Sequence, residues 1–449
     1  MSRAHLSWSA TRAVEFTVDY VVVGSGAGGA AAAVILARAG YEVALIEKGP
    51  WRDPEDYPHS MQGTMRDMFD TWGMRVAIGD SIMPVVQASL VGGTPVINSA
   101  IVVRTPGDVL ASWQLEHGLG DVFSEAAIGA AQDRIEAELQ VGPTEAVTFG
   151  QTGQLLLDAM QRRGMEVHRT DRNVHGCQGA SQCLQGCRNS AKKTPNLNWI
   201  PEVMTLGGTV LSCARVETII MASGAAVGVQ GRFQHPQSRR RGAAFRVQAR
   251  RGTVLAASAT GSPILMERSG IRLPYLGQGW RAHPGAGTLA VYPDPVDMTT
   301  GPSQAVASIH HRLDVGIKLE SLALPLELVA GRMSGGGHAL MERLAHYRHQ
   351  AMWVTAVRAE AVGRIRLGIF GGTRLTYQPT RRDLERLRTG TALLARLHFE
   401  MGATSVLPGV VGLPAEIGPD DVGLLDAAPL NNKAWTWVIS HLFGGCVMG

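Results

Sequence analysis

The stretch that decides the fold is Asp19-Tyr-Val-Val-Val-Gly24-Ser25-Gly26-Ala-Gly28-Gly29, which an alanine-rich run connects to Tyr41-Glu-Val-Ala-Leu-Ile-Glu47-Lys48-Gly49. An apolar strand, a glycine turn, a helix and a second strand that ends on an acid follow one another in this order. A dinucleotide needs this arrangement, because the turn lets its pyrophosphate approach the backbone at the positive end of the helix. The pattern therefore predicts a dinucleotide site.

The glycines of the turn have separate tasks. Gly24 allows the tight turn, Gly26 lets the pyrophosphate approach, and Gly29 lets the helix pack close to the strand. Glu47 is placed to accept hydrogen bonds from a ribose diol. The same two segments add three further expected cofactor-binding residues, Ser25, Gly28 and Lys48. The alternative is a glycine-rich turn that merely joins a strand to a helix. The pattern does not choose between nicotinamide and flavin, although its place near the amino terminus favours FAD.

Length and composition exclude several classes of protein. The chain has 449 residues, of which 45% are hydrophobic and 18% charged, so it can form two or three domain-sized units. Its net charge of +4 is small, and the basic run at 239–241 is typical of a solvated turn rather than a nucleic-acid surface. No stretch has the apolar length of a transmembrane segment, and the first residues lack the apolar core of a signal peptide. The sequence thus favours a cytoplasmic protein without nucleic acid as partner, and five cysteines argue against a disulfide framework.

Hydrophobic periodicity predicts the main elements. Helices are expected over 124–139, 150–163 and 380–401, the last with Leu384, Leu387, Leu394 and Leu397 on one face. A strand block at 209–220 is expected to pair with strands at 226–229 and 244–247. A buried strand is expected at 252–257, and a helix from Ser262. Because the cofactor-type segments are scattered, discontinuous domains are predicted.

Five segments together resemble one family. They are the glycine turn with Glu47, the segment Gly92-Gly93 to Asn98, the segment Val254 to Ile271, the segment Gly277 to Pro284, and the final His441-Leu-Phe-Gly-Gly-Cys-Val-Met-Gly449. In this order they resemble the glucose–methanol–choline (GMC) family of FAD-dependent oxidoreductases. The resemblance implies an α/β fold, with a Rossmann-like FAD-binding domain and a substrate domain built on an antiparallel sheet and helices.

The resemblance also implies domain boundaries. The FAD-binding domain is expected at 1–110 and 200–290. The substrate domain is expected at 111–199, which includes a cysteine-rich loop, and at 291–430. Residues 431–449 are expected to begin a carboxyl-terminal FAD and catalytic segment.

Roles for single residues follow from the resemblance. Gly92, Gly93 and Asn98 match the loop that runs along the flavin, and backbone near Val216 matches the place where the adenine is met. His441 matches the active-site histidine beside flavin N5. An imidazole with a pKa near neutral suits the hydroxyl proton that an alcohol loses when its carbinol hydrogen leaves as hydride. His283 matches a structural turn with Pro284.

One departure from the family concerns the end of the chain. Relatives continue past the histidine segment with a strand, a flavin-contacting turn and a closing helix, and that stretch carries a second catalytic histidine or asparagine. Because the sequence stops at Gly449, we expect a truncated form with weaker FAD binding and reduced activity.

Three cysteines form a second constellation. Cys177, Cys183 and Cys187 are spaced C-x5-C-x3-C in a glycine-rich loop. Thiolates are good iron–sulfur ligands, and the loop resembles one that holds a cluster in some bacterial GMC dehydrogenases. It also resembles the loop of GMC long-chain alcohol oxidases, where such cysteines need not hold iron. The alternatives are free thiols in a packed loop, or zinc with His175 as a fourth ligand.

The expected function is FAD-dependent oxidation of a small-molecule alcohol (a CH–OH donor) to an aldehyde or ketone, by hydride transfer to flavin N5 with His441 as base. Few clustered charges across 292–425 favour an apolar or medium-sized alcohol over a sugar. Three alternatives remain. The first is an iron–sulfur dehydrogenase subunit that passes electrons to a quinone, a cytochrome or another acceptor protein. The second is a nicotinamide-dependent dehydrogenase, and the third is a non-catalytic truncated remnant.

Overall fold

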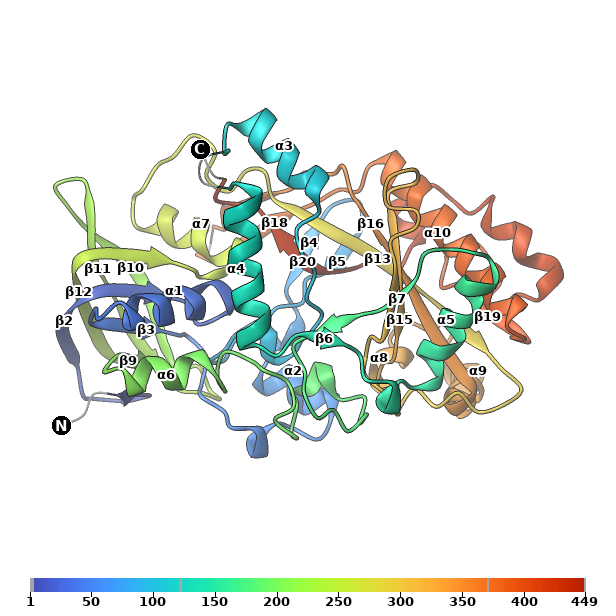
Figure 1. The fold of residues 1–449 in the computed structure, drawn as a ribbon, viewed down its shortest axis with the longest axis horizontal. Coiled ribbons are helices and arrows are strands. Elements are labelled where there is room, and N and C mark those ends of the chain that lie inside the picture. Colours follow the sequence, from blue (N-terminus) through green and yellow to red (C-terminus); the bar gives the residue numbers. More distant parts are fainter. Residues whose placement is uncertain (1–3, 121–122, 370, 448–449) are drawn as a thin grey trace.

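The structure is a computed structural model that describes residues 4–120, 123–369 and 371–447. Within these ranges the strands form two large sheets, which lie toward the two ends of the long axis in Figure 1, and two small ones. This mixed α/β architecture confirms the predicted fold class. Among the described residues, no helix is both long and apolar enough to cross a bilayer.

The first sheet is built around the glycine turn. Its strands, in spatial order, are β1 (His5–Leu6), β9 (Thr209–Leu211), β3 (Val43–Ile46), β2 (Val14–Val23), β12 (Arg241–Leu255), β11 (Ala225–Gln234) and β10 (Ala214–Ala222). β2 pairs in parallel with β3 and with β12, whereas β12, β11 and β10 pair antiparallel. The carboxyl ends of β2 and β12 therefore meet at one edge, which is where open α/β sheets bind ligands.

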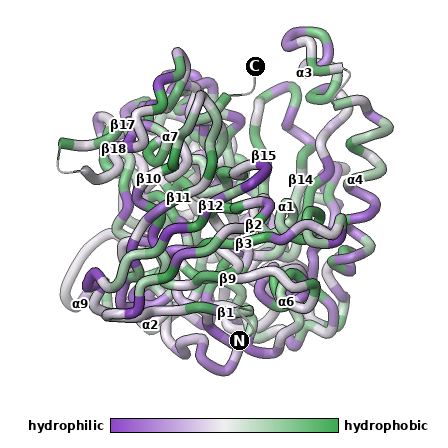
Figure 2. The backbone as a smooth tube through the Cα atoms, turned by 90° about the vertical axis from the view of Figure 1, so that its left-hand side faces the viewer, coloured by the Kyte–Doolittle hydropathy of each residue, from purple (hydrophilic) through white to green (hydrophobic). Residues whose placement is uncertain are grey.

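Helices cover both faces of this sheet, as Figure 2 shows. On one face, α1 (Ala27–Arg38) and α6 (Trp199–Thr205) pack on Val22. On the other face, Val21 and Val23 join a core that includes Leu265 of α7 (Ser258–Arg268). The three valines are almost fully buried, and their alternation between two cores follows from the two-residue period of a strand.

The second sheet is antiparallel. Its path is β19 (Ser405–Leu407), β13 (Arg281–Val291), β16 (Gln350–Val357), β15 (Ile317–Leu322), β14 (Val306–Ser308) and β7 (His168–Arg169), and β20 (Val438–Phe443) also pairs with β13. One face is covered by α10 (Arg381–Glu400), which packs so closely that a Cβ at Gly390 would lie 2.3 Å from Thr355 Cγ2. The helix begins with a capping box at Thr380, and all four of its predicted core leucines are buried.

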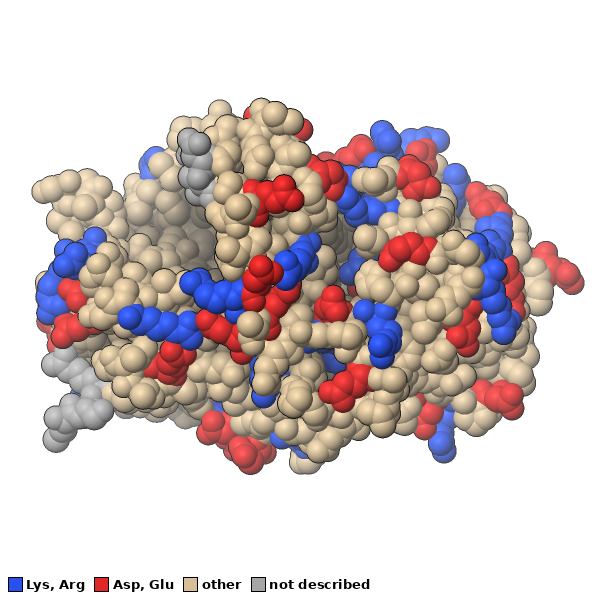
Figure 3. All heavy atoms as spheres, in the orientation of Figure 1, with Lys and Arg blue, Asp and Glu red and all other residues tan. Residues whose placement is uncertain are grey.

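Smaller elements connect the two sheets. A four-stranded sheet holds β17 (Arg364–Leu367), β18 (Thr373–Thr376), β4 (Val76–Ile78) and β5 (Ile82–Pro84), and a two-stranded one holds β6 (Gly142–Pro143) and β8 (Asp171–Arg172). The remaining helices are α2 (Met61–Asp67), α3 (Gly107–His117), α4 (Glu125–Glu138), α5 (Gln151–Arg162), α8 (Leu326–Ala330) and α9 (Gly337–Ala345). Figure 3 shows that this face of the molecule is hollowed on either side of the α3–α4 segment.

The structure differs from the predicted elements in three places. The strand block at 209–220 is two strands, because Cys213 has a left-handed φ of 53° that turns the chain between β9 and β10. The strands expected at 244–247 and 252–257 are one strand, β12. The helix expected from Ser262 begins at Ser258, whose hydroxyl accepts a hydrogen bond from the Gly261 N–H and so caps the first turn.

Candidate functional site

The two glycine segments of the sequence lie against each other at the carboxyl edge of the first sheet. A Cβ at Gly93 would lie 2.6 Å from Gly26 Cα, so the two backbones are in direct contact. The Ser25 hydroxyl accepts a hydrogen bond from the Gly92 N–H, at 3.1 Å, and links the segments a second time. Residues that are more than sixty positions apart thus form one wall.

The glycine turn has the shape that a pyrophosphate requires. A Cβ at Gly24 would lie 2.3 Å from the Ala256 carbonyl oxygen, and one at Gly29 would lie 1.9 Å from the Gly24 carbonyl oxygen. By contrast, a Cβ at Gly26 or Gly28 would meet nothing within 4 Å. No side chain caps the start of α1, so its first N–H groups face this open space. The residues present therefore fit a dinucleotide.

Glu47 holds the turn together as well as facing the site. Its carboxylate accepts hydrogen bonds from the Ser25 N–H at 3.1 Å, from the Ser25 hydroxyl at 2.8 Å and from the Gly49 N–H at 2.9 Å. The side chain is 7% exposed. A carboxylate oxygen has more than one lone pair, so these bonds leave acceptor capacity for a ribose diol.

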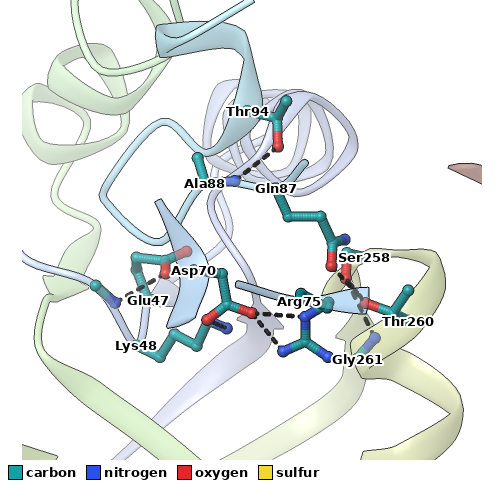
Figure 4. Close-up of polar contacts among 11 residues, drawn as sticks. Glu47, Lys48, Asp70, Arg75, Gln87, Ala88, Thr94, Ser258, Thr260 and Gly261 are labelled. Carbon is teal, nitrogen blue, oxygen red and sulfur yellow. Dashed lines mark hydrogen bonds and ion pairs between the residues drawn. The ribbon is translucent and has the colours of Figure 1, made fainter. Parts of the chain in front are cut away.

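Lys48 and Val216 lie beside Glu47. Lys48 forms an ion pair with Asp70 at 2.8 Å, and Asp70 also pairs with Arg75 (Figure 4). Burial opposes ionisation of Asp70, but the two cations outweigh it and hold the pKa of its carboxyl below the usual range. Val216 is buried in β10, whose first residue donates its N–H to the Glu47 carbonyl. Lys48 and Val216, both expected to bind the cofactor, therefore lie near Glu47 at the carboxyl end of β3.

Figure 4 also shows how α7 is joined to the second glycine segment. The Thr260 hydroxyl donates to Gln87 Oε1 at 2.8 Å, and both residues are buried. A few residues further along, the Thr94 hydroxyl accepts from the Ala88 N–H. The site is therefore bordered by the first turns of two helices, α1 and α7.

Asn98 lies in a segment whose backbone carbonyls accept hydrogen bonds from two buried cations, Lys192 and Arg172. Its side-chain oxygen accepts from the Ala100 N–H at 2.9 Å. The ammonium of Lys192, which is 1% exposed, donates to the carbonyl oxygens of Val96, Asn98 and Cys183 at 2.7–3.0 Å. Burial lowers the pKa of Lys192 to about 8.

Arg172 binds the same backbone segment as Lys192. It is also buried and donates from Nε to the Ser99 carbonyl oxygen at 2.9 Å. A strand residue and a loop lysine from the cysteine-rich region thus hold the 96–99 backbone in place. Neither residue was expected from the sequence, although a lysine next to a glycine- and cysteine-rich loop is a signal that could have marked Lys192.

The three cysteines are free thiols that contact other partners. Cys183 Sγ accepts a hydrogen bond from Arg172 at 3.2 Å, and Cys177 Sγ accepts from the Gly179 N–H at 3.4 Å. Burial opposes ionisation of Cys183, but Arg172 and Lys192 outweigh it and lower the pKa of the thiol. Over 4–120, 123–369 and 371–447, no group of three or more histidine, cysteine, aspartate or glutamate side chains is placed to hold a metal ion. The geometry gives no support to an iron–sulfur or zinc site here.

His441 lies on β20, next to a second histidine. Its ring centroid is 5.6 Å from that of His283, and the planes meet at 87°. Phe443 packs on His283 from the other side, with centroids 4.9 Å apart. From the sequence, His283 was expected only in a structural turn; it lies beside His441, the predicted base.

His283 and His441 both keep exposed surface, yet burial is the largest influence on the pKa of each. Burial, with the neighbouring His441, lowers the pKa of His283 to about 4. Burial lowers the pKa of His441 too; Glu320 partly offsets this effect and Lys318 adds to it. The lowered pKa favours the neutral form of the His441 ring, which can accept a proton.

A charged pair lies on the same face of the sheet. The register aligns Gly285 of β13 with Ala356 and Lys318, and Gly287 with Val354 and Glu320. Lys318 Nζ lies 2.7 Å from Glu320 Oε1, and Glu320 is 3% exposed. Because side chains alternate along a strand, His283 shares this face, opposite the one that α10 covers. Neighbouring side chains pack over the glycines of β13 on this face: a Cβ at Gly287 would lie 3.0 Å from Met352 Sδ, and one at Gly285 would lie 3.5 Å from Val354 Cγ2.

Comparisons with known proteins agree with this geometry. The GMC oxidoreductase family matches residues 18–285. An uncharacterised GMC-type oxidoreductase of Mycobacterium tuberculosis is 33% identical over 398 residues, which cover 88% of this chain and 62% of that protein. A long-chain-alcohol oxidase of Arabidopsis thaliana is 27% identical over 458 residues, which cover 96% and 60%. The chain spans less than two thirds of the length of these relatives.

Solved structures show the same fold at low identity. Pyridoxine 4-oxidase from Mesorbium loti has a TM-score of 0.69 and 16% identity, and the match covers 96% of this chain and 89% of that one. A formate oxidase variant from Aspergillus oryzae has a TM-score of 0.64 and 13% identity, and that match covers 86% and 82%.

Proposed function

The chain belongs to the GMC oxidoreductase family, and from this premise we propose that it is an FAD-dependent enzyme that oxidises an alcohol to an aldehyde or ketone. The observation that carries the proposal is the His441 ring on β20, which packs against His283 and whose lowered pKa favours the form that accepts a proton. Relatives named long-chain-alcohol oxidase and choline oxidase support an alcohol as the substrate class. The few clustered charges across 292–425 favour an apolar or medium-sized alcohol over a sugar.

The residues that would hold FAD come from four segments. Gly26, Gly28 and Gly29 would offer backbone N–H groups to the pyrophosphate. Gly24 and Ser25, whose N–H groups are donated to Ile46 and Glu47, would shape the turn around it. Glu47 offers its remaining lone pairs to the ribose, with Lys48 next to it, and the backbone near Val216 borders the adenine. Gly92, Gly93 and Asn98, held by Lys192 and Arg172, border the flavin ring.

His441 would act as the base. The alcohol O–H bond breaks and its proton passes to the free imidazole nitrogen, while the carbinol C–H bond breaks and its electron pair leaves with hydrogen as hydride. FAD, when bound, supplies the hydride acceptor. His283, whose pKa of about 4 keeps it uncharged, packs edge-on against His441 and limits the orientations of that ring. The product is a carbonyl compound, and the proton remains on His441 until solvent removes it.

Anaerobic mixing of the FAD-loaded chain with medium-length primary alcohols tests the proposal. Loss of the flavin absorbance at a rate that saturates with alcohol is expected. His441→Ala should keep bound flavin and slow this loss by about 10²–10⁴-fold. A yellow protein whose flavin no primary or secondary alcohol reduces would contradict the proposal and leave the non-catalytic alternative.

The route by which electrons leave the flavin is a separate question. Oxygen, a quinone or a protein acceptor could each serve an enzyme of this kind. Metal ligation by Cys177, Cys183 and Cys187 stays a prediction from the sequence, and metal analysis decides it independently of alcohol oxidation.

A further inference from the structure

The four-stranded sheet has one side that the rest of the described chain leaves uncovered. On its core side, one residue from each strand is 0–2% exposed: Ile365, Leu375, Ala77 and Met83. Because side chains alternate along a strand, their neighbours point to the opposite side, which we call the outer face. The register places these in two rows across β17, β18, β4 and β5: Arg366, Arg374, Val76 and Pro84, then Arg364, Thr376, Ile78 and Ile82. All are exposed except Val76 and Thr376, which are partly buried.

Three arginines form the cationic half of the outer face. Arg366 lies directly opposite Arg374, and Arg364 lies on the same side of β17, two residues away. Like charges at opposed positions destabilise a sheet. Among the residues that the structure describes, no carboxylate pairs with any of the three, and none of their side chains donates a hydrogen bond. Asp80, in the turn between β4 and β5, accepts a hydrogen bond from Gln378 instead. The uncompensated positive charge favours an anionic partner.

The other half of the outer face is apolar. Ile78 and Ile82 are opposed in the register and are 51% and 71% exposed. A third isoleucine, Ile369, lies in the turn between β17 and β18 and is 96% exposed. Figure 2 shows this hairpin at the outer edge of the molecule, on the side opposite α3 and α4. Exposed apolar side chains bordered by charge are typical of a surface that contacts a membrane or another protein.

We propose that the outer face docks on an anionic lipid surface. Guanidinium groups bind phosphate oxygens through two parallel hydrogen bonds, and the isoleucines would enter the boundary between headgroups and acyl chains. An acidic protein segment would account for the arginines alone. A lipid surface accounts for both halves, because its headgroups are anionic and its interior is apolar. The inference is independent of the proposed alcohol oxidation, because lipid binding is measured without substrate.

Cosedimentation of the FAD-loaded chain with lipid vesicles tests the proposal. The parent chain should bind vesicles that contain phosphatidylglycerol, should not bind vesicles of phosphatidylcholine alone, and should bind less as salt is raised. Arg374→Gln should weaken binding about fivefold, and the combination with Arg364→Gln and Arg366→Gln about 100-fold, since each arginine near an anionic surface contributes about fivefold. Ile78→Ser together with Ile82→Ser should weaken binding about tenfold, because less apolar surface is buried.

Two variants elsewhere on the surface are matched controls. Arg162→Gln removes an exposed arginine of α5 that has no partner among the described residues, and Leu313→Ser removes a leucine that is 73% exposed. Both should bind vesicles like the parent chain. Because the substituted side chains are exposed, every variant should keep the melting temperature of the parent, which separates lost binding from lost folding.

Three results would overturn the proposal. One is a parent chain that does not bind anionic vesicles. Another is a triple arginine variant that binds them like the parent or like the controls. The third is arginine-dependent binding of polyglutamate without binding of vesicles, which would identify an acidic protein as the partner of the outer face.

Discussion

Gly93 lies against Gly26 so closely that a Cβ on Gly93 would be 2.6 Å from Gly26 Cα. The two glycines have different reasons for lacking a side chain. Gly93 has a φ of 63° and no room, whereas Gly26 has a φ of −67° and open space. Gly93→Ala should therefore destabilise the fold by about 1–3 kcal/mol. Gly26→Ala should keep the stability of the FAD-free chain and weaken FAD binding. Denaturant unfolding measures the stability of the two variants, and flavin titration measures their affinity for FAD. If Gly93→Ala and Gly26→Ala changed stability and affinity alike, the prediction would be wrong.

A second prediction concerns Glu47, which joins Ser25 and Gly49. Glu47→Ala should lower the flavin content of the purified chain, because charge-assisted hydrogen bonds of about 1.5–3 kcal/mol each are lost. It should also lower the melting temperature of the FAD-free chain, since the Ser25 N–H loses its acceptor. Ser25→Ala, which removes the link to Gly92 but keeps the carboxylate, is the control and should bind more FAD than Glu47→Ala. Unchanged flavin content in Glu47→Ala would rule out the ribose role.

The pH dependence of flavin reduction gives a third prediction. Because burial lowers the pKa of His441 from its ordinary value of 6.5, the neutral form of the ring predominates above pH 6.5. Protonation removes its acceptor, so the acid limb of the rate should be centred below pH 6.5, and the rate should fall as the pH drops through it. Stopped-flow measurements on the parent chain and on His441→Ala check this. The variant should lose the acid limb; a parent limb centred above pH 7 would exclude His441 as the base.

The fourth prediction is on stability and involves His398 of α10. Its ring is fully buried, stacks on Trp353 at 3.5 Å and shares a hydrogen bond with the Tyr292 hydroxyl at 2.9 Å. Burial lowers its pKa to about 3. Between pH 6.5 and 3 the unfolded chain binds a proton that the folded chain does not, so stability is present above pH 6.5 and is lost as the pH falls.

Substitution of His398 isolates this contribution. In His398→Gln the free energy of unfolding should depend less steeply on pH over that range, by up to about 1.4 kcal/mol per pH unit. Urea unfolding at several pH values measures the slope. The same slope in parent and variant would show that His398 does not titrate on unfolding.

A fifth prediction follows from the cysteine loop. If Cys177, Cys183 and Cys187 hold an iron–sulfur cluster, anaerobic purification should give stoichiometric iron, and Cys187→Ser should abolish electron transfer to an external acceptor while flavin reduction survives. The contacts of Cys183 with Arg172 favour the opposite result, iron-free protein with three free thiols. Metal analysis together with thiol titration distinguishes the two.

The sequence predicted the part of the site that local chemistry determines. The turn at Gly24 to Gly29 and the end of β3 at Glu47 depend on backbone conformation and strand order, and both leave a pattern in the chain. The hydrogen bonds of Lys192 to residues 96–99 could not be predicted, because they form between segments that only the tertiary fold brings together; the sequence marks only a lysine beside the cysteine-rich loop. His283 was assigned a turn for the same reason: its neighbour His441 is more than 150 residues away.

Two other features depended on single dihedral angles and on the register. The left-handed φ of Cys213 divides a stretch that the sequence favours as one strand, and no glycine or proline at that position marks the turn. The small cavity lined by Gly287, Leu289 and Arg332 lies where the pairing of β20 with β13 stops and that of β19 begins, which is a property of the register and not of composition. Domain boundaries and the roles of the single site residues stay predictions.

The pairing of β2 with β12 also sets the order in which the site can form during synthesis. Val14 lies opposite Phe245, and Val23 opposite Leu255, so the strand that carries the glycine turn waits for a partner roughly 230 residues later in the chain. At 5–20 residues per second, a ribosome needs about 10–50 s to make that stretch. Until then the nascent turn has β3 on one side and an unpaired edge on the other. The cofactor site is thus among the last parts of the first sheet to form. Until β12 is made, the free edge of β2 has no strand partner in this sheet.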